Sequence, residues 1–70
     1  MTNFKCFFLN GTKYSIMTNV TIDKIVQYFN YHTKLSVLEY NGLICNKKIW
    51  NTIQLKNNDK IEIVTIVGGG

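Results

Sequence analysis

Three consecutive glycines, Gly68, Gly69 and Gly70, are the residues of this 70-residue chain whose type and position best fit covalent chemistry. They follow a strongly apolar segment, so that the α-carboxylate of Gly70 stands at the end of an arm without side chains. Glycine takes backbone conformations that are closed to other residues and can pass through a narrow channel. Because a carboxylate must be activated before acyl transfer, typically by adenylation, we expect Gly70 to react inside another enzyme. The alternative is an incidental, frayed chain end.

The other reactive side chains offer no comparable arrangement. His32 is the only histidine and has no cysteine or carboxylate at a recognised spacing. Cys6 and Cys45 lie in apolar segments, away from features that lower a thiol pKa, so inert and reduced cysteines are expected rather than a disulfide. The four carboxylates form no acid–base pair, and the sequence holds no set of metal ligands. We therefore expect no enzyme activity, no catalytic residue, no bound cofactor and no metal.

Composition limits the partners and the compartment. The net charge of +4 comes from eight lysines that are spread along the chain, so the basic patch of a nucleic-acid-binding protein is missing. We find no segment of membrane-spanning length and no signal peptide, and expect a soluble protein that contacts neither nucleic acid nor membrane. The abundance of Asn, Ile, Lys, Tyr and Phe indicates an AT-rich genome. The expected location is the cytoplasm, or the plastid stroma if the gene is organellar.

The first elements that must position the arm are a hairpin and a helix. Asn10-Gly11 is the preferred pair for a tight turn and predicts strands over 4–9 and 12–17. Both faces of the first strand are apolar, so we expect the face that includes Phe8 to be exposed for a partner. The helix is predicted over 22–30, with Thr21 as its N-cap, from apolar residues at helical spacing: Ile22, Ile25, Val26 and Phe29.

The second half of the chain contains another hairpin and the last strand. Residues 36–45 form two strands around the Asn41-Gly42 turn, and the segment around Trp50 is a helical turn or an irregular loop. The last strand, 61–67, becomes apolar on both sides, as a central strand would. A hairpin, a helix, a short hairpin and a final strand predict an α+β fold.

This order predicts the β-grasp, or ubiquitin-like, arrangement, a four- to five-stranded mixed sheet gripping one main helix. We expect a single domain over residues 1–67 and a flexible C-terminal tail over residues 68–70.

The chain resembles the ThiS family, the sulfur-carrier proteins of thiamine thiazole biosynthesis. The resemblance is carried by Trp50, by Leu9-Asn10-Gly11, Asn41-Gly42 and Leu55, and by Asp59, Ile61-Glu62-Ile63-Val64 and Val67-Gly68-Gly69-Gly70. Two pairs depart from the family pattern: Asn46-Lys47 stands where Pro-Arg is usual, and Asn57-Asn58 replaces Asp-Gly. Lys47 keeps the charge without the bidentate fork of arginine, and Asn58 tolerates positive φ.

The resemblance implies a mechanism and a set of partners. A ThiF-like adenylyltransferase would use ATP and Mg²⁺ to adenylate the Gly70 carboxylate. Sulfur mobilised by a cysteine desulfurase would then replace AMP and give a C-terminal thiocarboxylate. A ThiG-like thiazole synthase would accept the sulfur. For partner docking we expect the sheet face around Phe8, with Ile66 and Val67 leading into the tail, and Lys47.

Three other functions fit the same fold. The small subunit of molybdopterin synthase shares the tail chemistry but serves another acceptor. A ubiquitin-like protein-conjugating modifier would transfer the activated glycine to lysines. A plain β-grasp binding module would carry the glycines incidentally.

Overall fold

Five strands and one α-helix form within residues 4–66, the part of the chain that the computed structural model describes. The elements are β1 (Lys5–Leu9), β2 (Thr12–Ile16), α1 (Ile22–Tyr28), η1 (Thr33–Leu35), β3 (Ser36–Tyr40), β4 (Leu43–Cys45), η2 (Lys47–Thr52) and β5 (Asp59–Thr65), where η denotes a 3₁₀ helix. Val67 and the glycines of the tail lie outside the described residues.

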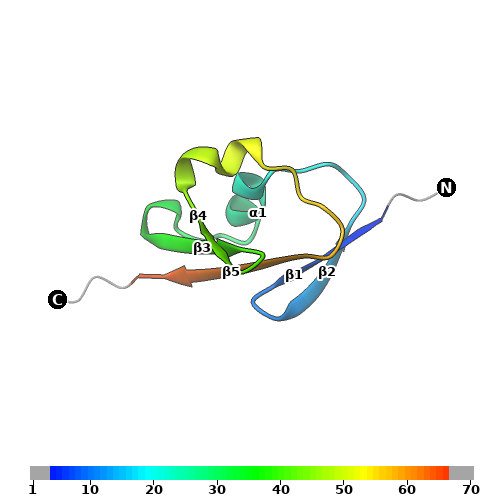
Figure 1. Cartoon of the computed structure of the whole chain (residues 1–70), viewed down its shortest axis with the longest axis horizontal. Helices are drawn as coiled ribbons and strands as arrows, with labels where there is room; N and C mark the ends of the chain where they lie inside the picture. The colour runs from blue at the N-terminus through cyan, green and yellow to red at the C-terminus, as the bar shows by residue number, and fades with distance from the viewer. Residues whose placement is uncertain (1–3, 67–70) are drawn as a thin grey trace.

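The strands make one mixed sheet in the order β2-β1-β5-β3-β4. The pairing of β1 with β5 is parallel, whereas β1 with β2, β3 with β4 and β3 with β5 are antiparallel. In Figure 1 α1 and the segment that includes η2 lie above the sheet, and the opposite face of the sheet is open. The expected β-grasp fold is confirmed, and the last strand is central, as predicted.

The core lies between α1 and the face of the sheet toward it. Alternate residues of β5 enter this core, because side chains of a strand point to opposite faces in turn. Its members are Phe7, Leu9, Ile22, Ile25, Val26, Leu38, Trp50, Leu55, Ile61 and Ile63. Trp50 is only 2% exposed, and its Nε1 donates a hydrogen bond to the Cys45 carbonyl oxygen at 3.1 Å. The indole thus fixes η2 against the core, and the predicted helical turn around Trp50 is confirmed.

Two asparagine–glycine turns close the hairpins in the left-handed conformation that the sequence predicts. Asn10 and Gly11 have φ of 50° and 84°, and Asn41 and Gly42 have φ of 52° and 89°. Both central residues of a type I′ turn need positive φ, which explains the preference for Asn-Gly. Open space surrounds the Cα atoms of both glycines, so backbone strain rather than crowding disfavours a side chain there.

The side chains of the two turn asparagines, Asn10 and Asn41, form hydrogen bonds with the backbone of β5. Asn10 accepts a hydrogen bond from the Ile63 N–H at 2.8 Å and donates to the Ile63 carbonyl oxygen at 3.2 Å. Asn41 accepts from the Lys60 N–H at 2.8 Å. The backbone N–H of Asn10 also donates to the Ile61 carbonyl at 2.9 Å. These bonds extend the pairing of β5 beyond the last residues of β1 and β3.

We expect Asn10→Gly to lower the free energy of unfolding by about 2 kcal/mol, because glycine keeps the turn conformation but removes the side-chain bonds to β5 and to the Tyr31 hydroxyl. Urea denaturation measures this loss. Asn30→Gly is the matched control, since Asn30 also has positive φ, 61°, and should lose no stability. Equal effects of the two substitutions would mean that the Asn10 side chain does not stabilise β5.

Helix α1 ends earlier than expected, at Tyr28 rather than near residue 30. Asn30 is left-handed, its N–H donates to the Gln27 carbonyl, and the Tyr31 N–H donates to the Val26 carbonyl. This is a Schellman motif with asparagine in the place of glycine. Residue 30 therefore terminates the helix.

Two further expectations need correction at the ends of elements. Thr21 occupies the N-cap position, but its hydroxyl donates to the Asp23 carboxylate and caps no backbone N–H. Strand β5 begins at Asp59, two residues before the predicted start, because Asn58 with φ of 70° completes the turn that precedes it. The positive φ of Asn58 agrees with its predicted role as a substitute for glycine.

Candidate functional site: the open face of the sheet

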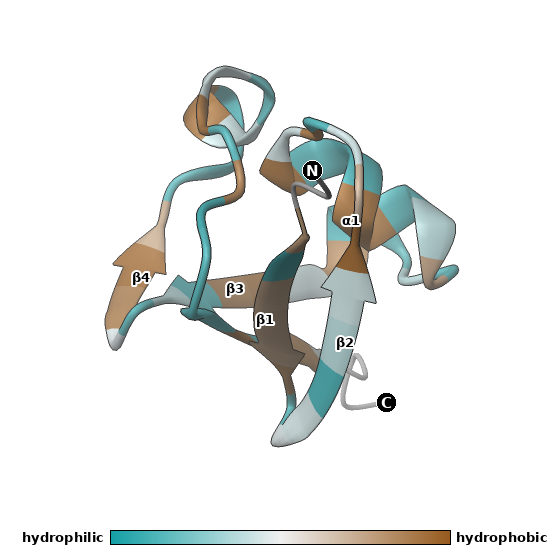
Figure 2. Cartoon of the chain, turned by 90° about the vertical axis from the view of Figure 1, so that its right-hand side faces the viewer, coloured by the Kyte–Doolittle hydropathy of each residue, from teal (hydrophilic) through white to brown (hydrophobic). Residues whose placement is uncertain are grey.

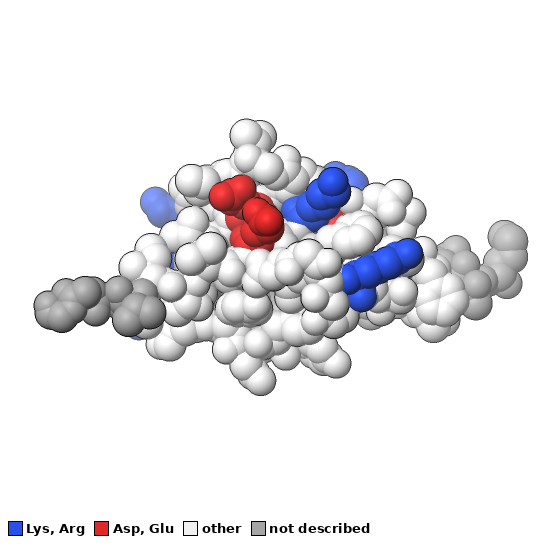
Figure 3. Space-filling view, turned by 90° about the horizontal axis from the view of Figure 1, so that it is seen from below, with Lys and Arg blue, Asp and Glu red and all other residues white. Residues whose placement is uncertain are grey.

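The face of the sheet that points away from α1 is here called the open face. It includes side chains of β5, the strand that precedes the C-terminal glycines. Buried and exposed residues alternate along β5, so Lys60, Glu62 and Val64 point to this open face. Phe8 of β1 lies opposite Lys60, and Glu39 of β3 lies opposite Glu62. Figure 3 views the molecule from this side.

Large apolar side chains remain exposed on this face and at its β4 edge. Val64 is 63% exposed, Ile66 53% and Ile44 76%. These side chains stay exposed because one short helix covers only one face of the sheet. The apolar residues of the second face are available for contact with another protein.

Two carboxylates stand side by side in the middle of the open face. Glu39 and Glu62 are direct cross-strand partners, and they are two of only four acidic residues in a chain of net charge +4. Figure 3 shows the acidic side chains gathered in the centre of this view, with lysines to one side. Like charges directly opposite each other destabilise a sheet. A basic group of a partner protein would relieve this repulsion.

A hollow of about 470 Å³ lies beside these carboxylates, between the two hairpin turns. It is lined by Phe8, Gly11, Glu39, Gly42, Lys60, Ile61 and Glu62. Apolar surface from Phe8 and negative charge from the glutamates meet in it. A side chain with an apolar stem and a cationic end, such as arginine or lysine, matches this combination.

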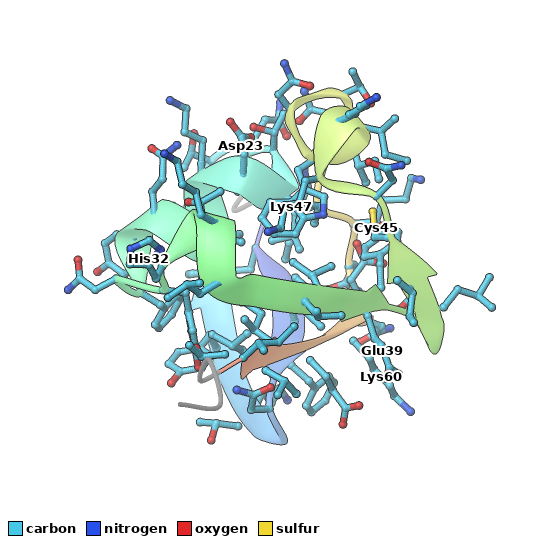
Figure 4. All side chains as sticks on the ribbon, turned by 90° about the vertical axis from the view of Figure 1, so that its left-hand side faces the viewer. Asp23, His32, Glu39, Cys45, Lys47 and Lys60 are labelled. Atoms are coloured by element: carbon cyan, nitrogen blue, oxygen red, sulfur yellow. The ribbon has the colours of Figure 1, made fainter. Side chains whose placement is uncertain are left out.

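Ile66, the residue that follows β5, is hydrogen-bonded to η1. The Ile66 N–H donates to the Leu35 carbonyl oxygen at 2.6 Å, and the Lys47 Nζ donates to the Lys34 carbonyl oxygen at 2.9 Å. In Figure 4 Lys47 lies on the same side of β3 as Asp23 of α1, and Glu39 and Lys60 lie on the opposite side. Ile66 and Lys47, which are far apart in the sequence, thus both contact η1 at the point where the chain leaves the sheet.

The predicted docking residues Phe8 and Ile66 lie near opposite ends of β5. Phe8, which is partly buried, pairs with Lys60 near the beginning of the strand, whereas Ile66 follows its end. At the rise of an extended chain these positions are about 20 Å apart. Val67, with the tail residues Gly68, Gly69 and Gly70, lies outside the described residues.

Asp59, the first residue of β5, has a structural role. It is 5% exposed, and its carboxylate accepts hydrogen bonds from the Tyr40 hydroxyl at 2.6 Å, the Lys56 N–H at 2.7 Å and the Asn41 Nδ2 at 3.2 Å. Burial, with the bond and the charge of Asp59, raises the pKa of Tyr40 to about 12. In the sequence, the one sign of a special role for Asp59 is its place among the residues that carry the resemblance to the ThiS family.

The cysteines and the histidine contribute no reactive arrangement to the described part of the chain. Cys6 and Cys45 are free thiols, as expected, and partial burial raises the pKa of Cys45. His32 is exposed at the start of η1 (Figure 4). Within residues 4–66, no three histidine, cysteine or acidic side chains lie close enough together to hold a metal ion. No helix of residues 4–66 is long and apolar enough to span a membrane.

A mixed five-stranded sheet with one main helix on one face defines a ubiquitin-like protein of the β-grasp class. Within this class the sequence model of the ThiS family matches residues 8–70, and the chain belongs to that family. This membership supports a sulfur-carrier role.

Individual proteins are similar to the chain in sequence or in fold. The chain is 53% identical to the uncharacterised protein ycf40 of Trieres chinensis over 66 residues, which are 94% of this chain and 90% of the relative. It is 24% identical to ycf40 of Porphyra purpurea, over 89% of this chain and 87% of that protein. The fold matches the crystal structure of the thiamine biosynthesis protein ThiS from Geobacter metallireducens. That match has a TM-score of 0.79, 16% identity and coverage of 93% and 99% of the two chains.

Proposed function

We propose that this protein is the sulfur carrier of thiazole formation in thiamine biosynthesis and that the Gly70 carboxylate carries the sulfur. The observation that supports this most strongly is the ThiS family match, which spans the folded part and continues through Gly70. The protein itself catalyses no step in this proposal. If its gene is organellar, it acts in the plastid stroma.

The proposed reaction has two steps on the tail. An oxygen of the Gly70 carboxylate attacks the α-phosphorus of ATP in a ThiF-like adenylyltransferase, with Mg²⁺ neutralising the phosphates, and diphosphate leaves. In the second step the outer sulfur of a persulfide formed by a cysteine desulfurase attacks the acyl carbon, and AMP leaves. A thiol, such as excess cysteine, then reduces the S–S bond of this acyl disulfide and is itself oxidised to a disulfide, which leaves the sulfur on the Gly70 carbonyl carbon. The resulting thiocarboxylate donates its sulfur in a ThiG-like thiazole synthase.

The open face of the sheet is the proposed docking surface for the adenylyltransferase. It joins exposed apolar groups, Val64 and Ile66, to the chain that leads into the tail, so docking there directs the tail toward the partner. We expect the adenylyltransferase to place a basic group against the Glu39–Glu62 pair. Lys47 of η2, whose Nζ bonds to η1 from the side of the sheet that α1 covers, is proposed as a separate contact.

The function is tested by incubating the protein with ATP, Mg²⁺, the adenylyltransferase, the desulfurase and cysteine, and then measuring intact mass. A mass gain equal to the exchange of one oxygen for sulfur is expected, followed by loss of that gain when thiazole synthase and its substrates are added. Loss of the gain only in the presence of the large subunit of molybdopterin synthase and its substrate would assign the alternative acceptor. Ladders of larger adducts would indicate a protein-conjugating modifier, and no mass change would reject both sulfur-carrier roles.

We expect Val64→Ser and Phe8→Ser to lower kcat/KM for adenylation about tenfold, because they remove apolar contact from the docking surface. Val64 is exposed, so its replacement should leave the unfolding free energy nearly unchanged. Tyr28→Ser, at a more exposed site on α1, is the control and should react like the unaltered protein. If the Val64 and Phe8 variants were adenylated at the normal rate, the docking surface would lie elsewhere.

A further inference from the structure

A backbone hydrogen bond at Ile66 joins the end of β5 to η1. Ser36, the first residue of β3, pairs with Thr65, the last residue of β5. The Ile66 N–H donates to the Leu35 carbonyl oxygen at 2.6 Å, so η1 extends this pairing by one residue. Figure 2 shows β3 starting below α1 and running toward β4, so η1 lies at the α1 end of β3. Four residues, 67–70, follow the bond at Ile66.

Two side-chain hydrogen bonds hold η1 in place. The hydroxyl of Ser36, which is fully buried, donates to the His32 carbonyl oxygen at 2.6 Å. The same carbonyl oxygen accepts from the Leu35 N–H at 3.0 Å. From η2, the Lys47 Nζ donates to the Lys34 carbonyl oxygen at 2.9 Å. Ser36 and Lys47 therefore help to fix the position of the Leu35 carbonyl oxygen, the acceptor for Ile66.

The bond at Ile66 limits the length of chain that can enter an active site. Residues 67–70 span at most about 14 Å beyond Ile66, at about 3.5 Å per extended residue. When the bond to Leu35 opens, Ile66 joins the arm and the reach grows by about 3.5 Å. Deletion of Gly70 shortens the reach by the same amount. Opening the bond and deleting Gly70 therefore have opposite effects on the reach of the terminal carboxylate.

We propose that the Ile66–Leu35 hydrogen bond sets the reach of the tail, and that Ser36 and Lys47 are positioning residues that keep this bond closed. The inference rests on the proposed sulfur-carrier function, because reach matters only if the Gly70 carboxylate reacts inside another enzyme. A chain without Gly70 regains its reach only when the bond is open. The Lys47 ammonium has three N–H donors, so its bond to η1 leaves donors for the separate contact proposed above.

The bond itself is tested without any enzyme, by NMR hydrogen exchange of the Ile66 amide in the ¹⁵N-labelled full-length protein. Ser36→Ala and Lys47→Met each remove one hydrogen bond from η1, so we expect Ile66 to exchange about threefold faster in either variant. Asn10→Gly, which removes side-chain bonds from another part of β5, should speed exchange at Ile63 and not at Ile66. Unchanged Ile66 exchange in both η1 variants would overturn the proposal, and so would an equal effect of Asn10→Gly on Ile66.

The effect on reach is tested by combining each η1 substitution with deletion of Gly70 and measuring the initial rate of thiocarboxylate formation at saturating carrier. In the shortened chain, Ser36→Ala and Lys47→Met should each raise the residual rate about threefold, because the open state that restores the reach becomes about threefold more populated. In the chain that keeps Gly70, Ser36→Ala should change the rate by less than about twofold. A substitution that only damaged the fold would lower the rate of both chains.

Two control variants separate the hydrogen bond from the charge. Lys47→Arg keeps an N–H donor and should produce no gain in the shortened chain, and Lys48→Met removes one charge from the neighbouring residue and should produce none either. If neither Ser36→Ala nor Lys47→Met raised the rate of the shortened chain, the inference would be overturned and the sulfur-carrier function would stand. If the unaltered chain formed no thiocarboxylate, the proposed function would fail together with the role of reach, and Ile66 exchange would still decide whether Ser36 and Lys47 hold the bond.

Discussion

A chain that lacks Gly70 is expected to stay folded and to lose conversion to the thiocarboxylate by at least about 100-fold. The deletion moves the carboxylate to Gly69, which shortens the reach of the arm by about 3.5 Å. An error of about 1 Å in the position of a reacting group can cost roughly 100-fold in rate. Intact mass after the coupled reaction measures the effect on sulfur transfer.

Stability should be nearly unchanged by this deletion, because the core lies within residues 4–66. Gly70→Ala is the matched comparison: it keeps the length of the arm and adds one methyl group, so its reaction should be slowed rather than lost. Normal sulfur transfer by the shortened chain would show that the Gly70 carboxylate is not the reactive group. A loss of more than about 1 kcal/mol of unfolding free energy would show that the tail stabilises the fold.

Trp50→Ala is expected to lower the free energy of unfolding by about 3–5 kcal/mol, because it empties a large core site and leaves the Cys45 carbonyl oxygen without its indole donor. A chain of this length has a total stability of roughly 4–10 kcal/mol. The substitution therefore removes much of the stability, and urea denaturation followed by circular dichroism measures the loss.

Two variants in η2 refine this test. Trp50→Phe keeps most of the apolar volume but removes the Nε1–H, so its cost should be smaller than that of alanine. Ile49→Ala, at an exposed position of the same 3₁₀ helix, should cost less than about 1 kcal/mol. If Trp50→Ala were no more harmful than Ile49→Ala, the indole would not connect η2 to the core.

The sequence predicted an element correctly where neighbouring residues alone determine its conformation. Asn10-Gly11 and Asn41-Gly42 specify their turns through positive φ, which depends on those residues alone. The spacing of the apolar residues in α1 identified its buried face. The end of α1 was misplaced because Asn30 stops the helix through left-handed geometry, a role more common for glycine.

The candidate site was less predictable, because it depends on which strands become neighbours. Glu39 and Glu62 belong to different strands, and only the register of β3 with β5 places them opposite each other. Asp59 is buried where Tyr40, Asn41 and the Lys56 backbone converge, an environment that depends on the pairing of β3 with β5. The exposure of Val64 depends on the absence of a second covering layer over the described sheet.

The three terminal glycines were singled out by the sequence alone, and so were the β-grasp order of elements and the resemblance that makes sulfur the proposed cargo. Composition and local spacing carry this information, since a turn, an amphipathic helix and a side-chain-free arm are properties of neighbouring residues. Only the tertiary structure decided which face of the sheet stays open and how Lys47 and Ile66 come to share η1. These features arise from contacts between residues distant in the sequence, which local patterns do not encode.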